Sequence, residues 1–299
     1  MKKTPFFSVV FWMLFLIGCS SRPMGEQPVG QRTSQADALM ESGYNASGNF
    51  ESTLALASFE DALGLYALDD HREGMVVALL AMEREARILG DVKSAGIYLH
   101  HAQALALATS SPRLRRIALN AVAAEALRIE DFDKAREALG MGEEGQNALV
   151  SQGRERAVQL RLLGRLADVE GRKTEAQVFL QEAVEVAREA MAHGEAAQAC
   201  YKLASMASLV GDYDEAKTWA LEALKEDGLA GNGAGVAADL RALGIISEKS
   251  GDGENAADYY RRSWLAWRAL GRFGEAAAAQ EALESLLGES VGFPGNLSP

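Results

Sequence analysis

The sequence holds few cysteines, prolines and tryptophans: 2 Cys, 6 Pro and 4 Trp among 299 residues. Two cysteines exclude a disulfide framework, and scarce proline leaves long helices uninterrupted. Runs of β-branched residues are also scarce, whereas Ala and Leu dominate, which favours helices. Because 48% of the chain is hydrophobic, it can bury a sizeable core. We therefore expect an all-α protein.

Long apolar stretches are missing as well. The longest, residues 6–17 (FFSVVFWMLFLI), has about 12 residues, whereas a helix that spans a bilayer needs roughly 20. It follows Lys2 and Lys3, and this order is typical of a secretory signal peptide. Residues 16–19 (LIGC) end the run and place Cys19 directly before Ser20. These four residues resemble the lipobox of bacterial lipoproteins.

The lipobox resemblance implies that residues 1–18 are a signal peptide and that Cys19 carries lipid. In that family the thiol is diacylated, the chain is cut before the cysteine and the new amine is acylated, so several acyl chains anchor the protein. Ser20 stands where Asp retains many such proteins in the inner membrane, which favours the outer membrane, facing the periplasm. Residues 19–34 are polar with Pro and Gly, as expected of a flexible tether. The alternative is an ordinary cleaved signal with a chance cysteine.

Basic residues are fewer than acidic ones, with 30 Lys and Arg against 42 Asp and Glu, which gives a formal net charge of −12. An acidic chain repels nucleic acid, so we expect no nucleic-acid partner. If Cys19 carries lipid, Cys200 has no partner within the chain. We interpret Cys200 as a small buried hydrophobe on a helix, and an intermolecular disulfide is the alternative.

Short turn signals recur at a period near 40 residues. They begin at Gly48, Gly90, Glu130, Gly171, Gly211 and Gly251, with spacings of 42, 40, 41, 40 and 40. Small residues keep the same period after the turns, at Ala95, Ala135, Ala176, Ala216 and Ala256. Others precede the turns, at Ala123, Gly164, Ala204 and Gly244. The intervening segments have helical periodicity. Each unit is therefore predicted to be a helix, a tight turn and a second helix, with small residues where the helices approach.

This pattern is similar to the tetratricopeptide repeat (TPR) family, whose usual repeat has about 34 residues. The run 211–216 (GDYDEA) is close to the family's turn. The resemblance implies an all-α, TPR-like α-solenoid, a right-handed superhelix, over residues 35–288. We expect six repeats, a capping helix within 274–287 and a disordered tail at 289–299.

Some features depart from the TPR pattern. Glu83 stands where the second repeat should have a small residue, and the register of the first repeat, between 43 and 62, is ambiguous. The glycine-rich segments 140–145 and 227–235 predict breaks in or near second helices and inter-repeat turns. A HEAT or armadillo solenoid, with repeats of roughly 40–47 residues, is the alternative fold.

Signs of catalysis or of a cofactor are nearly missing. Residues 140–145 (GMGEEG) match G-x-G-x-x-G, but helical sequence precedes them where the dinucleotide motif needs a strand. His100 and His101 would point about 100° apart on a helix, which suits surface imidazoles better than a shared metal. Trp264 and Trp267 are interpreted as core residues, with a carbohydrate platform as the alternative. We expect no enzyme activity, no cofactor and no metal.

In TPR arrays the first helix of each repeat lines a concave groove, which binds extended peptides or partner helices. Helical phase places this set on that face: Arg84, Arg87, Asn120, Arg128, Arg161, Arg165, Asp168, Gln198, Tyr201, Ser205, Ser208, Arg241, Glu248 and Lys249. Arg161 and Arg165 lie one turn apart, and Asp168 is within reach of Arg165. Arginines there would grip carboxylates, which predicts an acidic segment or C-terminus of another envelope protein as partner. Alternatively, the arginines pair with glutamates on neighbouring helices and bind nothing.

Three classes of function follow. The first is a non-enzymatic scaffold or assembly adaptor of the envelope, because solenoids offer large surfaces and few preformed catalytic pockets. Outer-membrane TPR lipoproteins with a similar layout include type IV pilus pilotins and β-barrel assembly components. The second is a module that binds glycan or cell-wall material, which needs aromatic side chains exposed in the groove. The third is an enzyme, which needs a polar pocket with a strongly perturbed carboxylate or histidine.

Overall fold

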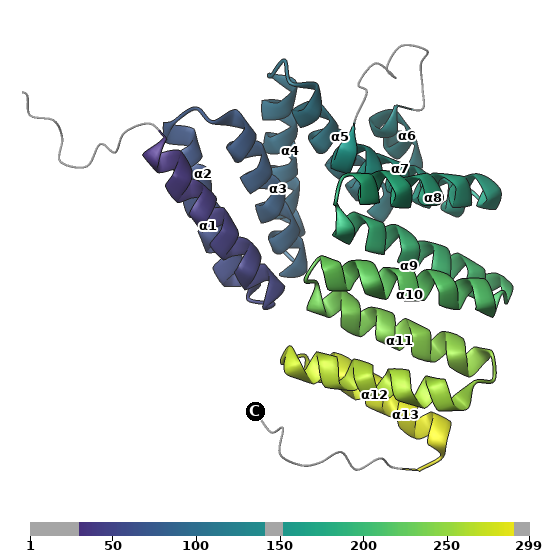
Figure 1. Ribbon diagram of the computed structural model, residues 1–299. Coiled ribbons are helices and arrows are strands. Elements are labelled where there is room, and N and C mark those ends of the chain that lie inside the picture. Colours follow the sequence, from purple (N-terminus) through teal and green to yellow (C-terminus); the bar gives the residue numbers. More distant parts are fainter. Residues whose placement is uncertain (1–29, 141–151, 290–299) are drawn as a thin grey trace, which may run out of the picture.

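The computed structural model describes residues 30–140 and 152–289, and within these ranges it contains helices and no strand. Six helix pairs follow one another, and a thirteenth helix ends this part of the chain (Figure 1). The helices are α1 (Gln31–Gly48), α2 (Ser52–Leu68), α3 (Arg72–Ile88), α4 (Val92–Leu107), α5 (Pro112–Arg128), α6 (Phe132–Leu139), α7 (Gly153–Val169), α8 (Lys173–Glu189), α9 (His193–Val210), α10 (Tyr213–Leu229), α11 (Gly233–Lys249), α12 (Gly253–Ala269) and α13 (Phe273–Leu287).

The turns repeat because a residue in the left-handed conformation follows most helices. Inside the pairs these residues are Phe50, Gly90, Glu130, Gly171, Gly211 and Gly251. Glycine adopts this conformation without a steric penalty, which explains the recurring glycine. In the first pair the left-handed residue is Phe50 rather than Gly48. The first spacing is therefore 40 residues, which resolves the register of the first repeat.

The aspartates that follow these turn residues cap the next helix. The side chains of Asp91, Asp131, Asp212 and Asp252 each accept a hydrogen bond from the backbone N–H three residues later, at 3.0 to 3.3 Å. The recurring Gly-Asp pair thus ends one helix and starts the next.

Small residues lie where the two helices of a pair meet, as the sequence predicts. A Cβ on Gly164 would lie 2.7 Å from Leu180 Cγ, and one on Gly244 would lie 2.6 Å from the Tyr260 ring. The alanines that follow the turns are fully buried: Ala95, Ala135, Ala176, Ala216 and Ala256. A larger side chain at Gly164 or Gly244 would push the two helices apart.

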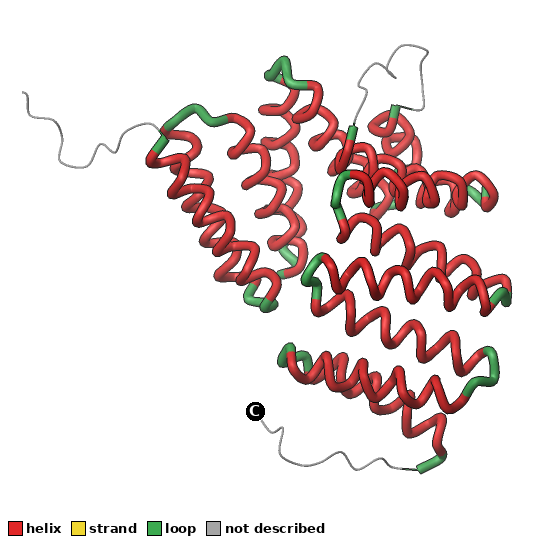
Figure 2. The backbone as a smooth tube through the Cα atoms, in the orientation of Figure 1, coloured by secondary structure: helices red, strands yellow, loops and turns green. Residues whose placement is uncertain are grey.

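The helix pairs form a curved array, with consecutive pairs side by side (Figures 1 and 2). The curvature brings the α1–α2 turn near the far end of the array. The Arg272 guanidinium lies 4.2 Å from the centroid of the Phe50 ring. Phe50 also packs against the hydrophobic cluster that contains Trp264 and Trp267. The first and last repeats of the array therefore touch through a cation–π contact.

One predicted boundary is wrong, because helix α1 begins at Gln31, inside the segment 19–34 expected to be a tether. The predicted break at 227–235 contains an inter-repeat turn: α10 continues to Leu229, and the Asn232 side chain caps α11. Helix α6 precedes the G-x-G-x-x-G match and ends at Leu139. Residues 141–145, Cys19 and the tail after 289 lie outside the described residues.

Several side chains have the environments that the sequence predicts. Cys200 is buried, and burial raises the pKa of its thiol to about 12, so it behaves as a small hydrophobe. Trp264 and Trp267 are buried core residues, which removes the aromatic platform considered above. His100 and His101 are exposed. In the described part of the chain, no three His, Cys, Asp or Glu side chains are placed to hold a metal, and no helix is long and apolar enough to cross a membrane.

Candidate functional site

Three predicted groove arginines are paired within the chain. Arg84 lies 3.2 Å from the buried carboxylate of Glu85. Arg87 and Arg128 both bind Glu125, at 2.7 and 2.8 Å. For these arginines the structure supports the alternative interpretation, in which they pair with glutamates of the same or a neighbouring helix.

Asn120 and Asp168 also have partners within the chain. Asn120 is buried and donates a hydrogen bond of 2.9 Å to a backbone carbonyl of α7. The Asp168 carboxylate binds Lys173 at 2.5 Å and Lys202 at 2.6 Å. Although burial opposes it, hydrogen bonds from these lysines hold the pKa of Asp168 below its usual value. The expected contact between Arg165 and Asp168 is therefore wrong.

The structure brings four of the predicted residues into one cavity of about 490 Å³, which we call the polar pocket. Helices α7, α9 and α11, the first helices of three successive pairs, supply most of its lining, and α10 and the α10–α11 turn supply the rest. The lining residues are Arg161, Arg165, Ala197, Gln198, Tyr201, Lys202, Asp227, Asn232, Gly235, Ala238 and Asp239. Its volume is in the range of ligand pockets.

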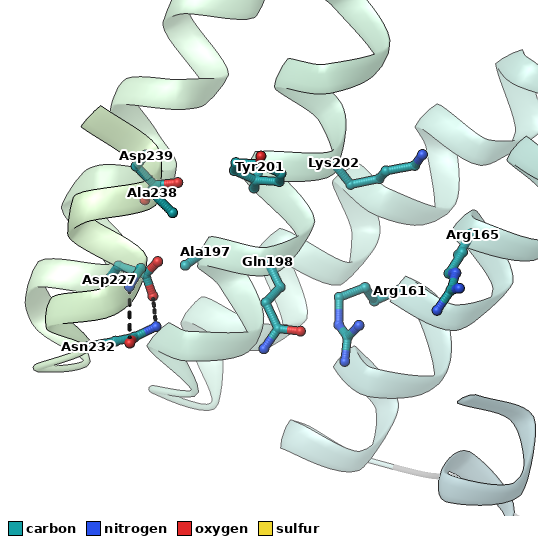
Figure 3. Close-up of a pocket in the computed structure, with 11 residues that line it drawn as sticks. Arg161, Arg165, Ala197, Gln198, Tyr201, Lys202, Asp227, Asn232, Ala238 and Asp239 are labelled. Carbon is teal, nitrogen blue, oxygen red and sulfur yellow. Dashed lines mark hydrogen bonds between the residues drawn. The ribbon is translucent and has the colours of Figure 1, made fainter. Parts of the chain in front are cut away.

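The polar pocket has opposite charges on its two sides. Figure 3 shows Arg161 and Arg165 on one side, Asp227 and Asp239 on the other, and α9 between them with Gln198 and Tyr201. Arg161 lies 3.1 Å from the Glu195 carboxylate. Arg165 is exposed and makes no ion pair or hydrogen bond with the described residues.

A second cavity of about 180 Å³ lies beside the polar pocket. Its lining includes four residues that helical phase predicts for the groove face: Tyr201, Ser205, Ser208 and Lys249. The predicted faces of α9 and α11 therefore form one continuous surface along the two cavities. Tyr201 lines both cavities and is 46% exposed. Arg241 is exposed on α11 and lines neither of them. Another predicted residue, Glu248, accepts a hydrogen bond of 2.6 Å from the Tyr260 hydroxyl.

Asp227 and Asp239, which we call the acidic pair, lie close together at the seam between α10 and α11. Their exposed fractions are 7% and 2%. Burial, followed by the charge of Asp227 and a hydrogen bond between the two carboxyl groups, raises the pKa of Asp239 to about 8. Burial also raises the pKa of Asp227. At neutral pH the pair therefore holds one proton, which Asp239 donates to the Asp227 carboxylate.

Sequence reasoning missed the acidic pair, because its members are 12 residues apart on different helices and one lies in an apparent glycine-rich break. The glycines are the signal that could have found it. A Cβ on Gly235 would overlap the Asp227 carboxylate, so this glycine makes room for the carboxyl group. Asn232 then holds Asp227 Oδ1 at 2.9 Å.

Comparisons with solved structures show the same fold at low sequence identity. The chain is similar to BtubC (BKLC) from P. vanneervenii, with 16% identity, a TM-score of 0.51, and coverage of 82% of this chain and 93% of that one. The chain is also similar to a Rap protein complexed with competence and sporulation factor, with 15% identity and a TM-score of 0.52. That match covers 86% of this chain and 77% of the Rap protein. A third similar structure is PilW, a type IV pilus biogenesis factor, with 14% identity and a TM-score of 0.50. That match covers 85% of this chain and 98% of PilW.

Sequence comparison adds no closer relative: no protein-family model matches, and no curated protein matches. The helix pairs, their period and these structural neighbours together show that the chain is an all-α, TPR-like solenoid.

Proposed function

We propose that the protein is a non-enzymatic scaffold or assembly adaptor of the bacterial envelope, which binds a segment of another protein in the polar pocket. One observation carries this proposal: the first helices of three successive repeats converge on a pocket in which Arg165 has no partner among the described residues. An arginine so placed can bind a carboxylate of an acidic segment or of a chain terminus. The Rap and PilW structures support a protein partner, since one is complexed with competence and sporulation factor and the other is a type IV pilus biogenesis factor.

The lipobox resemblance of residues 16–19 supports the proposed location in the envelope. A lipid on Cys19 would anchor the protein to the outer membrane, facing the periplasm, as the lipobox resemblance implies. The polar residues after Cys19 would act as a tether that lets the solenoid reach partners near the membrane. Tethering raises the effective concentration of the pocket near membrane-bound proteins without any additional contact.

The acidic pair favours a second candidate, an acid–base enzyme, because a carboxyl group with a raised pKa in a polar pocket is a sign of such chemistry. We rank this candidate second, since the described residues that line the polar pocket include no Ser, Thr, Cys or His that could act beside the carboxyl groups. The glycan-binding alternative ranks lower, because Trp264 and Trp267 are buried and, in the described ranges 30–140 and 152–289, Tyr201 is the one aromatic residue that lines the polar pocket.

Charge reversal at the basic side of the polar pocket tests the proposed function. We expect Arg161→Glu with Arg165→Glu to reduce partner capture from crosslinked native membranes at least about tenfold, because it replaces two carboxylate-binding groups with repelling ones. Quantitative mass spectrometry of the captured proteins measures the change.

Two controls keep this result interpretable. Lys225→Glu with Arg261→Glu changes the net charge equally at exposed sites on α10 and α12 and should leave capture unchanged. Because Arg161 also holds the buried Glu195, Arg165→Glu alone serves as a variant that breaks no ion pair seen in the structure. If the double variant and Arg165→Glu alone both capture the same proteins as the wild type, the proposal is wrong.

A further inference from the structure

The acidic pair differs from the other buried carboxylates in the described part of the chain, because it has no cation. Glu85 is bound by Arg84, Asp168 by Lys173 and Lys202, Glu195 by Arg154 and Arg161, and Glu226 by Arg188 and His193. No ion pair reaches Asp227 or Asp239 in the described residues. Buried carboxylates are usually paired, since the loss of hydration otherwise costs several kcal/mol.

The basic residues of the polar pocket do not fill this role. Arg161 binds Glu195, and Lys202 binds Asp168, so both already have carboxylate partners. Arg165 lies on the opposite side of the pocket from the acidic pair (Figure 3). Asp239 Oδ2 is buried and accepts no hydrogen bond from any residue that the structure describes, although its residue lines the pocket. An acceptor in this state lacks a donor that a ligand could supply.

The fold does not need these two carboxyl groups. Helices α10 and α11 repeat α8 and α9 with a shift of 40 residues, as their boundaries at Tyr213 and Gly233 against Lys173 and His193 show. The residues 40 positions before the acidic pair are Ala187 and Ala199, and both are fully buried. The preceding pair of helices thus packs with alanine at both positions, so the carboxyl groups are a local addition to the solenoid.

We propose that the acidic pair is the binding site for one ammonium or guanidinium group, a lysine or arginine side chain of the segment that occupies the polar pocket. The site rests on the unpaired Asp239 Oδ2, the missing cation and the cavity in front of both carboxyl groups. Tyr201, beside them on α9, offers an aromatic ring that a bound cation can also contact. The segment's own carboxylate would then meet Arg165 across the pocket. The identity of the occupant as a protein segment rests on the proposed function.

A ligand cation would replace the proton that the two carboxyl groups share, so binding releases a proton and strengthens as pH rises. The probe is n-butylammonium, which is a cation throughout the range used and resembles a lysine side chain. We expect saturable binding to the wild type, measured by protein-observed NMR, that is at least about fivefold tighter at pH 9 than at pH 6. The neutral analogue n-butanol should show no such change.

Two substitutions test whether the acidic pair is the site. Asp239→Asn keeps the shape and a hydrogen-bond donor toward Asp227 but fixes the charge, so binding at pH 9 should fall at least about fivefold and lose its pH dependence. Asp227→Ala with Asp239→Ala recreates the alanines of the preceding repeat and should bind no n-butylammonium. Asp258→Asn, at an exposed carboxylate on α12, is the matched control and should bind as the wild type does.

The outcomes separate this inference from the proposed function. The cation site is wrong if the wild type shows no saturable binding of n-butylammonium at pH 9. It is also wrong if Asp239→Asn binds n-butylammonium as tightly as the wild type does. Either result holds whatever the partner experiment shows. If the cation site is confirmed but Arg161→Glu with Arg165→Glu leaves partner capture unchanged, the scaffold proposal is wrong and the cation site is retained.

Discussion

Replacing Gly164 by leucine should destabilise the solenoid by about 3 kcal/mol or more, the largest effect that we expect from a single substitution. Gly164 lies on α7 against α8, and an added Cβ would lie 2.7 Å from Leu180 Cγ and 3.2 Å from the backbone oxygen of Ala176. The backbone oxygen cannot turn away, so the two helices must separate, and the cluster around Leu180 loses its packing. A shift of the urea midpoint, followed by circular dichroism, measures the effect.

The control for this prediction is the same substitution at an open site. Gly64 lies inside α2, and a Cβ there would meet nothing within 4 Å. Gly64→Leu should therefore be neutral or stabilising by up to about 1 kcal/mol, because leucine favours helix more than glycine does. Equal destabilisation at Gly64 and Gly164 would show that close helix approach is not what places glycine at 164.

The unfolding free energy should fall by about 4 kcal/mol between pH 5 and pH 9 because of the raised pKa of Asp239 alone. The pKa of Asp239 is about 8 in the folded protein, against 3.8 for a free aspartate. A raised pKa means that the folded state holds its proton more tightly than the unfolded state does. This contribution is complete below pH 4 and is lost as pH rises toward 8.

Other carboxylates act in the opposite direction, so the wild-type curve alone cannot isolate the acidic pair. The pKa values of Glu125, Asp168 and Glu226 are lowered by arginine, lysine or histidine partners, and the stability that they add is lost as pH falls through those lowered values. The measurement is therefore the difference between wild type and Asp239→Asn in urea unfolding at several pH values. A difference that stays constant between pH 5 and pH 9 would contradict the shared proton.

The repeat was predictable from the sequence because its signals are local. A left-handed turn residue and the capping aspartate after it are neighbours in the chain, as at Gly211 and Asp212. The small residue seven positions before the turn follows from helix geometry, as at Gly164 and Gly244. In the first turn the left-handed residue is Phe50 rather than Gly48, and its residue type does not suggest that conformation.

The site was only partly predictable, because its key contacts join different helices. Helical phase predicts that Arg161, Arg165, Gln198 and Tyr201 share one surface, and all four line the polar pocket. It could not show that Glu195, 34 residues after Arg161, would bind that arginine while Arg165 has no ion pair among the residues that the structure describes. Nor could it show that Asp227 and Asp239 meet, since that depends on the space that Gly235 leaves at the seam between α10 and α11.

The most direct test of the central claim is photo-crosslinking from the polar pocket in intact cells. The central claim is that Cys19 anchors a solenoid whose polar pocket holds a segment of another envelope protein. A photoreactive phenylalanine derivative replaces Tyr201 in the lipidated chain, and the same derivative replaces Leu221, of similar exposure on α10, as the control.

We predict a discrete crosslinked partner from position 201 in the membrane fraction and none from 221. With Cys19→Ser, the folded protein should leave that fraction and the crosslink should fall at least about tenfold. Crosslinks that are equal from both positions, or a Cys19→Ser protein that stays in the membrane with its crosslink intact, would contradict the account.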